Sequence, residues 1–437
     1  MLPSLKKEFD LSKSELSFYG TLEFLGYLIA SISIGSISDK LGRRNGMLVA
    51  QIVWLMAMFL SIFSPNIYVF SVLRCIVSTS HMVMAFSGFS LLSEIWPQRT
   101  RGIILNCNAF VAISAYITIA LLARITLPDI SNSDWRPLIL IYCVALAISI
   151  ILNYYFMEES PRYDLFIGQN MRAFKTIEKM AFDNLGQENF LAGGKKEQIE
   201  SWVANFNKEV EETLEDRKQE NRFIHEYKKL FKGPYKRITL TMFCVWIVTS
   251  SNLFGMELIL PTVLANISEG KGQHPLTILV YMNASILPCL LPLVAMVEMQ
   301  YFGRKKTLTL IYFAMGAAGC FSYFQIFPGL IFWLCLFKLS IHSSFMILYL
   351  FTGELYPTHI RVNAIGQISA ISRIGVIIIV WVAMFLIEIQ NFLPFLVYGL
   401  MGFSAFFVMN RLPYETLNED LDRIISPFLK NKPKLNL

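Results

Sequence analysis

Charged residues are scarce in this sequence. Only 16% of its 437 residues are Asp, Glu, Lys or Arg, whereas 54% are hydrophobic and the mean hydropathy is +0.50. In a soluble domain about a quarter of the residues are charged. The composition therefore excludes an ordinary water-soluble protein. The net charge of +6 is dispersed over many loops, so it does not indicate a nucleic-acid partner.

Several chemical motifs are also missing. The sequence has no Gly-rich phosphate loop, no nucleophilic serine elbow and no cluster of residues with metal-ligand spacing. We therefore expect no enzymatic activity, no catalytic residue, no metal and no cofactor. A cleavable signal peptide is missing as well, because residues 1–15 are polar and the first apolar run is a full span.

Apolar residues are concentrated in long runs. A run of about 18 or more apolar residues can cross a hydrocarbon core of about 30 Å as an α-helix. Runs of this kind predict an all-α, multi-pass protein embedded in a lipid bilayer, with eleven spans at residues 16–37, 46–63, 67–93, 103–126, 136–157, 238–265, 275–298, 306–327, 329–352, 363–387 and 391–411. All seven cysteines fall inside these runs, which argues against a disulfide framework.

Basic residues gather in alternate loops between the predicted spans. By the positive-inside rule these loops are cytoplasmic, namely 38–45, 94–102, 299–305 and 353–362 together with the tail. A long polar segment divides the spans into two groups. We expect a helical half of five spans at 1–157, a cytoplasmic loop at 158–237, a helical half of six spans at 238–411 and a cytoplasmic tail at 412–437. The sequence does not distinguish the plasma membrane from an intracellular vesicle membrane.

Two loop motifs recur in both groups of spans. Residues 39–44 follow the first span, and the related residues 303–305 occupy the equivalent loop about 260 residues later. Residues 94–101 and 354–361 both begin with Glu, carry Pro at the fourth position and end with Arg, and they recur at the same separation. Two independent motifs that recur at one separation indicate duplicated halves.

These motifs resemble those of the major facilitator superfamily, in its organic-cation-transporter-like branch and most closely the synaptic-vesicle-two-related proteins. Residues 159–164, 372–375 and 412–416 add to the resemblance. The resemblance implies a fold of two six-helix pseudo-repeats, in which the family's first helix has no counterpart here, with a solute site between the halves near the midplane. It is specific for the fold but not for the solute.

The resemblance and the complementary charges predict a cytoplasmic network that latches the halves in the outward-open state. Its expected members are Asp39, Gly42, Arg43, Arg44, Glu94, Arg101, Glu159, Arg162, Gly303, Arg304, Glu354 and Arg361. Glycine permits a tight turn, and arginine can bridge carboxylates bidentately. The alternative is that these residues only fix the topology.

Charges within the spans are the candidates for binding the solute or a coupling ion, because a central charge costs at least about 2.5–3.5 kcal/mol and so implies a partner. The candidates are Glu23, Arg74, Glu257, Lys338 and Arg373. Glu257 is the leading candidate for a cation or proton site, since Gly255 allows its helix to break or bend. The alternative is an internal ion pair between Glu257 and Lys338.

Two histidines lie at similar depths in corresponding spans. His81 and His342 could each titrate near neutral pH as part of a proton relay, or could be packing residues. Protons or another ion are therefore possible coupling partners.

The combined features predict a secondary active or facilitative transporter that moves a small organic ion by alternating access. A sugar porter is an alternative because it shares the cytoplasmic motifs, although residues 246–252 lack the paired glutamines expected there. A non-transporting membrane receptor or vesicle scaffold with the same fold is the other alternative.

Overall fold

The computed structural model describes residues 2–96, 98–128, 133–185, 201, 230–231, 235–268, 274–298, 303–325, 329–356, 358–412 and 415–416. The regular elements of this part of the chain are all helices. The first group comprises α1 (Leu2–Glu8), α2 (Lys13–Leu41), α3 (Arg43–Ser61), α4 (Ile67–Ile95), α5 (Gln98–Thr126) and α6 (Arg136–Phe156). The second comprises α12 (Tyr235–Ser268), α13 (Pro275–Glu298), α14 (Gly303–Phe324), α15 (Leu330–Leu355), α16 (Thr358–Ile389) and α17 (Leu393–Asn410).

A helix occupies the place of each predicted span. Nine of the helices described here are long and apolar enough to cross a membrane, and the apolar parts of the other two are shorter, at Phe110–Thr126 of α5 and Pro275–Cys289 of α13. The expected loop at 158–237 begins with two short helices, α7 (Pro161–Phe166) and α8 (Asn170–Leu185). Most of the rest of that loop, and the tail after Thr416, lie outside the described residues.

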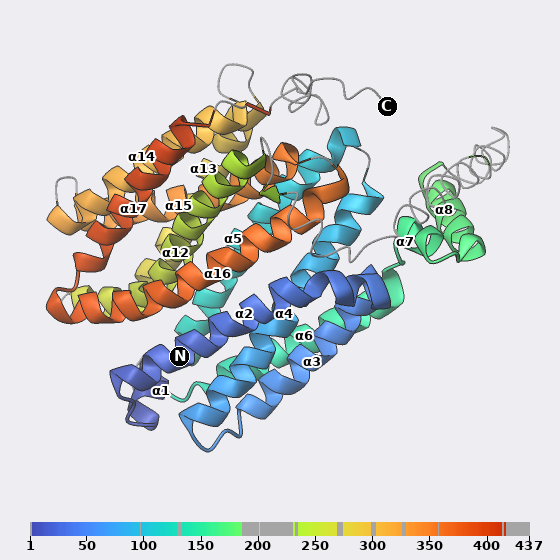
Figure 1. Ribbon diagram of the computed structural model, residues 1–437. Helices are drawn as coiled ribbons and strands as arrows, with labels where there is room; N and C mark the ends of the chain where they lie inside the picture. Colours follow the sequence, from blue (N-terminus) through green and yellow to red (C-terminus); the bar gives the residue numbers. More distant parts are fainter. Residues whose placement is uncertain are drawn as a thin grey trace.

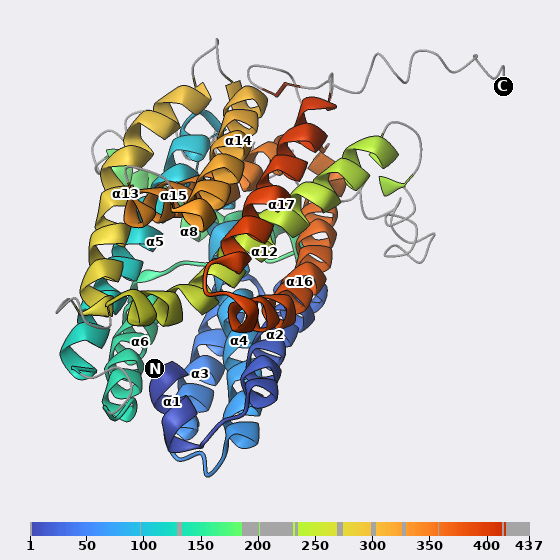
Figure 2. The ribbon, with the colours of Figure 1, turned by 90° about the vertical axis from the view of Figure 1, so that its left-hand side faces the viewer.

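The helices pack as two groups joined along two seams. In the first group α2, α3, α4 and α6 pack together, and in the second group α12, α14, α15, α16 and α17 do so. The groups, called here the N-terminal and C-terminal halves, meet where α2 lies beside α16 and where α5 lies beside α13 and α15 (Figures 1 and 2). Helices α7 and α8 lie at the end of the molecule away from α1 (Figure 1).

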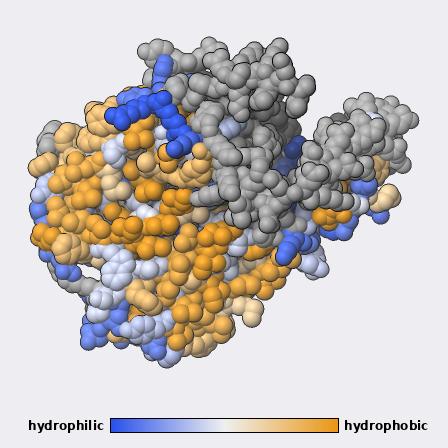
Figure 3. Space-filling model, viewed as in Figure 1, coloured by the Kyte–Doolittle hydropathy of each residue, from blue (hydrophilic) through white to orange (hydrophobic). Residues whose placement is uncertain are grey.

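The surface between the polar ends is apolar. Hydrophobic residues cover much of the described face in Figure 3, and hydrophilic residues gather toward its ends. Large apolar side chains face outward on several helices, for example Phe156 at 81% exposure and Ile125 at 75%. Such an exposed apolar surface is stable in lipid and unfavourable in water. The protein is therefore a multi-pass integral membrane protein, as its composition predicts.

Helix α12 differs from the expectation. It is continuous through Gly255 from Tyr235 to Ser268, so the helix does not break at Gly255. Glycine is needed there for packing instead, because a Cβ at this position would lie 2.5 Å from the hydroxyl oxygen of Tyr398 on α17.

Small residues bring α14 and α17 into close contact. A Cβ added to Gly319 would lie 2.6 Å from the Cα of Gly399, and one added to Gly399 would lie 2.7 Å from the backbone nitrogen of Cys320. Close backbone approach through small residues is a common way for helices to associate in membranes.

Replacing Gly399 by alanine is therefore expected to lower the free energy of unfolding by about 1–3 kcal/mol, because the two backbones must separate. Thermal unfolding in detergent would show this as a lower Tm. Gly366→Ala on α16 is the matched control, since a Cβ there meets nothing within 4 Å. An unchanged Tm for Gly399→Ala would contradict the close crossing.

Candidate functional site

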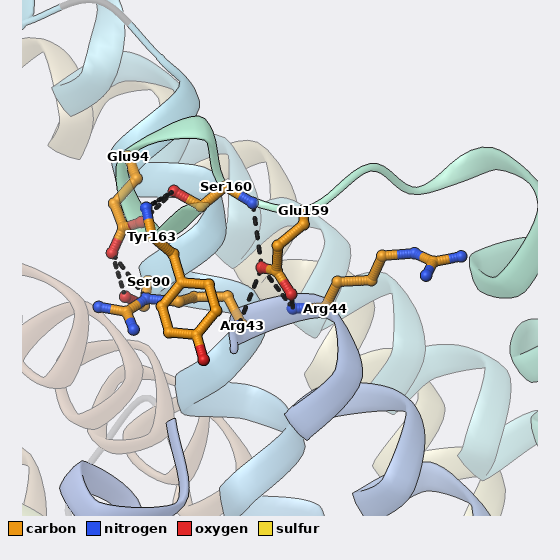
Figure 4. Close-up of polar contacts among 7 residues, drawn as sticks. All are labelled: Arg43, Arg44, Ser90, Glu94, Glu159, Ser160 and Tyr163. Carbon is orange, nitrogen blue, oxygen red and sulfur yellow. Dashed lines mark hydrogen bonds and ion pairs between the residues drawn. The ribbon is translucent and has the colours of Figure 1, made fainter. Parts of the chain in front are cut away.

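A carboxylate caps the helix that follows the first predicted cytoplasmic loop. Glu159 accepts hydrogen bonds from the backbone N–H groups of Arg43 at 3.0 Å and Arg44 at 3.0 and 3.2 Å, at the start of α3 (Figure 4). The N–H of Ser160 donates to the same carboxylate at 3.0 Å. The first N–H groups of a helix have no partner within it and attract negative charge. Glu159 therefore ties the start of α3 to the segment after α6.

Glycine allows this close approach. Gly42 has φ of +87°, and a Cβ at this position would lie 2.5 Å from Oε2 of Glu159. Any other residue would meet both backbone strain and a clash with the carboxylate.

The Arg43 side chain extends the contact to α4. Its Nε lies 3.0 Å from Oε1 of Glu94, and its guanidinium group lies 5.1 Å from the ring centre of Tyr163 on α7. Ser90 donates to the same Glu94 oxygen at 3.1 Å, and the Ser160 hydroxyl donates to the other oxygen (Figure 4). We call Gly42, Arg43, Arg44, Glu94, Glu159 and Ser160 the N-terminal clamp.

The C-terminal half repeats the carboxylate cap. Glu415, after α17, accepts hydrogen bonds from the N–H groups of Arg304 at 2.9 Å and Lys305 at 3.3 and 3.1 Å, at the start of α14. The N–H of Thr416 donates to Glu415 at 2.9 Å. Gly303 has φ of +65°, and a Cβ there would lie 2.6 Å from Oε2 of Glu415.

The side-chain contacts repeat as well. Arg304 Nε lies 3.2 Å from Oε2 of Glu354, and the Thr416 hydroxyl donates to the same oxygen at 2.5 Å. We call Gly303, Arg304, Lys305, Glu354, Glu415 and Thr416 the C-terminal clamp. The sequence prediction did not include Ser160, Lys305, Glu415 or Thr416 in the network. The sequence feature that could have identified these residues is a third repeated pair, Glu159 with Ser160 and Glu415 with Thr416.

The described clamp contacts do not involve the remaining predicted members of the network. The side chains of Asp39, Arg101 and Arg361 lie outside the described part of the structure. Arg162 is exposed on α7, and no hydrogen bond or ion pair joins it to a described member of either clamp. The contacts that are described join helices of the same half, so latching of the halves remains a prediction.

Asp164 lies beside the N-terminal clamp on α7. Its side chain is fully buried and forms an ion pair with Arg172 of α8, with 3.5 Å between Nε and Oδ2. Burial raises the pKa of Asp164, and the Glu159 charge raises it further, while Arg172 acts in the opposite direction.

Four of the five predicted intramembrane charges interact in pairs. Glu23 on α2 interacts electrostatically with Arg74 on α4. Glu257 on α12 forms an ion pair with Lys338 on α15, with 3.0 Å between Oε1 and Nζ. The internal pair considered as an alternative for Glu257 is therefore present.

Arg373 on α16 is the fifth charge, and its surroundings are aromatic. Its side chain is 1% exposed, and its guanidinium carbon lies 4.9 Å from the ring centre of Phe254 on α12 and 5.4 Å from that of Tyr27 on α2. Among the described residues, its Nε and Nη1 have no hydrogen-bond partner. The sequence did not predict the two aromatic partners, because their contact depends on helix rotation.

The two histidines have different surroundings. His81 on α4 packs against Trp54 of α3, with 5.1 Å between ring centres, and its Nδ1 lies 3.5 Å from the Tyr27 hydroxyl. His342 on α15 lies 3.3 Å from Glu257 and packs against Tyr116 of α5. The ring contact of His342 with Tyr116 joins the C-terminal half to the N-terminal half.

Comparison with known proteins agrees with the repeated motifs. The model of the Major Facilitator Superfamily matches residues 1–287. The synaptic vesicle 2-related protein of Xenopus laevis is 25% identical over 452 residues, covering 96% of this chain and 75% of the relative. Human solute carrier family 22 member 13 is 26% identical over 427 residues, covering 94% and 69%.

Solved structures show the same fold. The inward open conformation of the xylose transporter XylE from E. coli has a TM-score of 0.72 and 16% identity, covering 98% of this chain and 94% of that one. At this identity the likeness concerns the fold alone. The family model matches more than half of this chain. The chain therefore belongs to the Major Facilitator Superfamily, a family of membrane transporters, as its loop motifs led us to expect.

Proposed function

We propose that this protein is a secondary transporter that moves a small organic anion by alternating access of its two halves. One observation supports the sign of the solute. Glu23 offsets Arg74, and Glu257 offsets Lys338, so the fifth intramembrane charge, Arg373, remains positive. An uncompensated charge within a span costs at least about 2.5–3.5 kcal/mol, and an anionic solute would offset that cost.

The surroundings of Arg373 indicate the rest of the solute. A guanidinium group presents a planar fork of donors that matches a carboxylate or sulfonate. Tyr27 and Phe254 flank the fork with aromatic rings, which favour a small apolar or aromatic body. An aromatic monoanion combines both features.

The position of Arg373 fits alternating access. Tyr27 belongs to α2 of the N-terminal half, whereas Phe254 and Arg373 belong to α12 and α16 of the C-terminal half. A solute bound at Arg373 would touch both halves, and its site would open as they separate. Glu257, the cation site suggested by the sequence, is less suited to a solute because Lys338 and His342 already contact it.

The test is uptake into liposomes that contain the purified protein. The probes are labelled benzenesulfonate, labelled trimethylphenylammonium, which has the same ring and the opposite charge, and labelled glucose. We expect benzenesulfonate to enter faster than into protein-free liposomes. We expect Arg373→Met to lower that rate at least about tenfold, because a hydrogen bond to a charged group contributes about 1.5–3 kcal/mol.

The control removes a positive charge elsewhere. Lys175→Met alters an exposed residue of α8 and should leave uptake unchanged. Uptake of trimethylphenylammonium or glucose in place of benzenesulfonate would reject an anion carrier. Uptake of none of the probes would favour the receptor or scaffold alternative.

A further inference from the structure

A cluster of ionisable side chains lies in the C-terminal half, away from Arg373. Oε1 of Glu257 is 3.0 Å from Nζ of Lys338 and 3.3 Å from Nε2 of His342. The side chains of Lys338 and His342 are 1% and 9% exposed, and they lie one turn apart on α15. One carboxylate is thus shared by a lysine cation and by an imidazole, a group that can bind a proton.

His342 also faces the N-terminal half. Its ring packs edge-on against Tyr116 of α5, with 5.3 Å between centroids and an interplanar angle of 61°. The backbone carbonyl of Tyr116 accepts a hydrogen bond from Asn283 of α13 at 3.5 Å, and Ile113 and Ile286 form a buried apolar contact beside it. Separation of the halves along this seam would remove Tyr116 from the imidazole.

We propose that His342 is a proton-binding site that controls this seam, so that the transporter carries a proton together with its anion. The second part of the inference rests on the proposed function, because it requires a negatively charged solute. The first part, a proton-dependent seam, requires no assumption about the solute.

The charged and titratable groups around His342 define its environment. Helices α5, α12, α13, α14 and α16 all pack against α15. Among their described titratable groups, Glu257 of α12 and Tyr116 of α5 contact the imidazole, and Lys338 of α15 itself shares the Glu257 carboxylate. Glu257 is the carboxylate in contact with the imidazole. Arg124 of α5 donates a hydrogen bond to Thr277, and the hydroxyl groups of Tyr312 on α14 and Thr249 on α12 are hydrogen-bonded to each other.

These contacts give the proton effect a direction. A protonated imidazole forms a charge-assisted hydrogen bond with Glu257 while its ring packs against Tyr116 of the N-terminal half. Lys338 opposes the added charge, but it is itself held by the same carboxylate. Protonation therefore favours the closed seam seen in this structure, and loss of the proton favours separation.

Charge balance connects the proton to the solute. Without solute, the Glu257–Lys338 pair is neutral and Arg373 contributes one positive charge. A bound monoanion cancels that charge, and a proton on His342 restores it. The carrier loaded with one anion and one proton therefore has the same net charge in its spans as the empty carrier. The empty carrier and the loaded carrier therefore move the same net charge through the membrane field when the halves change position.

His81 provides a matched control within the chain. It lies in the corresponding span of the N-terminal half, but its ring contacts are Tyr27 of α2 and Trp54 of α3, both in its own half. Replacing it removes a buried imidazole without touching the α5–α15 seam.

The experiment measures the seam by double electron–electron resonance in liposomes without any solute. Spin labels are attached at Ile125→Cys on α5 and Phe332→Cys on α15, which are 75% and 51% exposed, after the seven native cysteines have been replaced by alanine. Samples are compared at about pH 5.5 and about pH 8, on either side of the ordinary histidine range. We expect the short-distance population to be about threefold larger at the acidic pH.

Point variants test whether His342 is responsible for the pH response. His342→Gln should remove the pH response, and His81→Gln should keep it. If His342→Gln does not fold, Tyr116→Leu replaces it, and this variant should reduce the response by removing the ring. A parent protein without a pH response, or a response that persists in the His342 or Tyr116 variant, would overturn the proton site.

A second measurement tests the coupling. Liposomes loaded with the pH dye pyranine are given an inward gradient of benzenesulfonate, and internal acidification that depends on His342 is expected. Benzenesulfonate entry without acidification would overturn proton coupling and leave the anion carrier standing. A pH-dependent seam with no benzenesulfonate entry would leave the proton site standing and reject the proposed solute.

Discussion

Replacing Glu257 by glutamine is expected to lower the free energy of unfolding by about 3–5 kcal/mol, the typical cost of removing one partner of a buried ion pair. Lys338 is 1% exposed, and its ammonium group lies 3.0 Å from the carboxylate. A glutamine amide leaves that ammonium buried without a compensating charge. The loss in free energy of unfolding should fall toward the lower end of this range, because the Glu257 side chain is 28% exposed.

Unfolding in mixed detergent micelles, followed by tryptophan fluorescence, would measure this loss. The double variant Glu257→Gln and Lys338→Met is the control, because it removes both charges. Its stability should return to near that of the parent, since replacing both members of a buried pair is often neutral. A single variant within about 1 kcal/mol of the parent would show that the pair is not important for stability.

The placement of the helices could be predicted from the sequence because its causes are local. Each apolar run must satisfy its own backbone hydrogen bonds in lipid, and a helix does this without help from distant residues. The runs at 67–93 and 136–157 accordingly correspond to α4 (Ile67–Ile95) and α6 (Arg136–Phe156). The recurring loop motifs also identify residues of both clamps, because each motif lies at a helix end where such contacts form.

The partnerships of the intramembrane charges could not be predicted in the same way. Which faces of α12 and α15 meet depends on helix rotation and tilt, so the sequence left Glu257 undecided between a solute site and a pair with Lys338. The aromatic partners of Arg373 come from two other helices, one in each half. Gly255 is a related case, because the sequence does not reveal that this glycine packs closely against Tyr398 in a helix that continues through it.

The clamps should each stabilise the half in which they lie. Glu159→Gln and Glu415→Gln are each expected to lower the free energy of unfolding by about 2–4 kcal/mol, because hydrogen bonds to a charged group contribute about 1.5–3 kcal/mol each and are not fully additive. Each carboxylate accepts from three backbone N–H groups. Glu158→Gln is the matched control, since this neighbouring glutamate is 43% exposed and pairs with Lys179 at the surface.

The double variant Glu159→Gln and Glu415→Gln then separates stability from latching. The described contacts of each clamp stay within one half, so we expect the two losses to add to within about 0.5 kcal/mol. The same micelle unfolding assay measures this sum. A coupling energy clearly above that value would mean that the clamps act together across the boundary, as the predicted outward-open latch requires. Additive losses would assign any such latch to other residues, and Asp39, Arg101 and Arg361 would then be the next positions to vary.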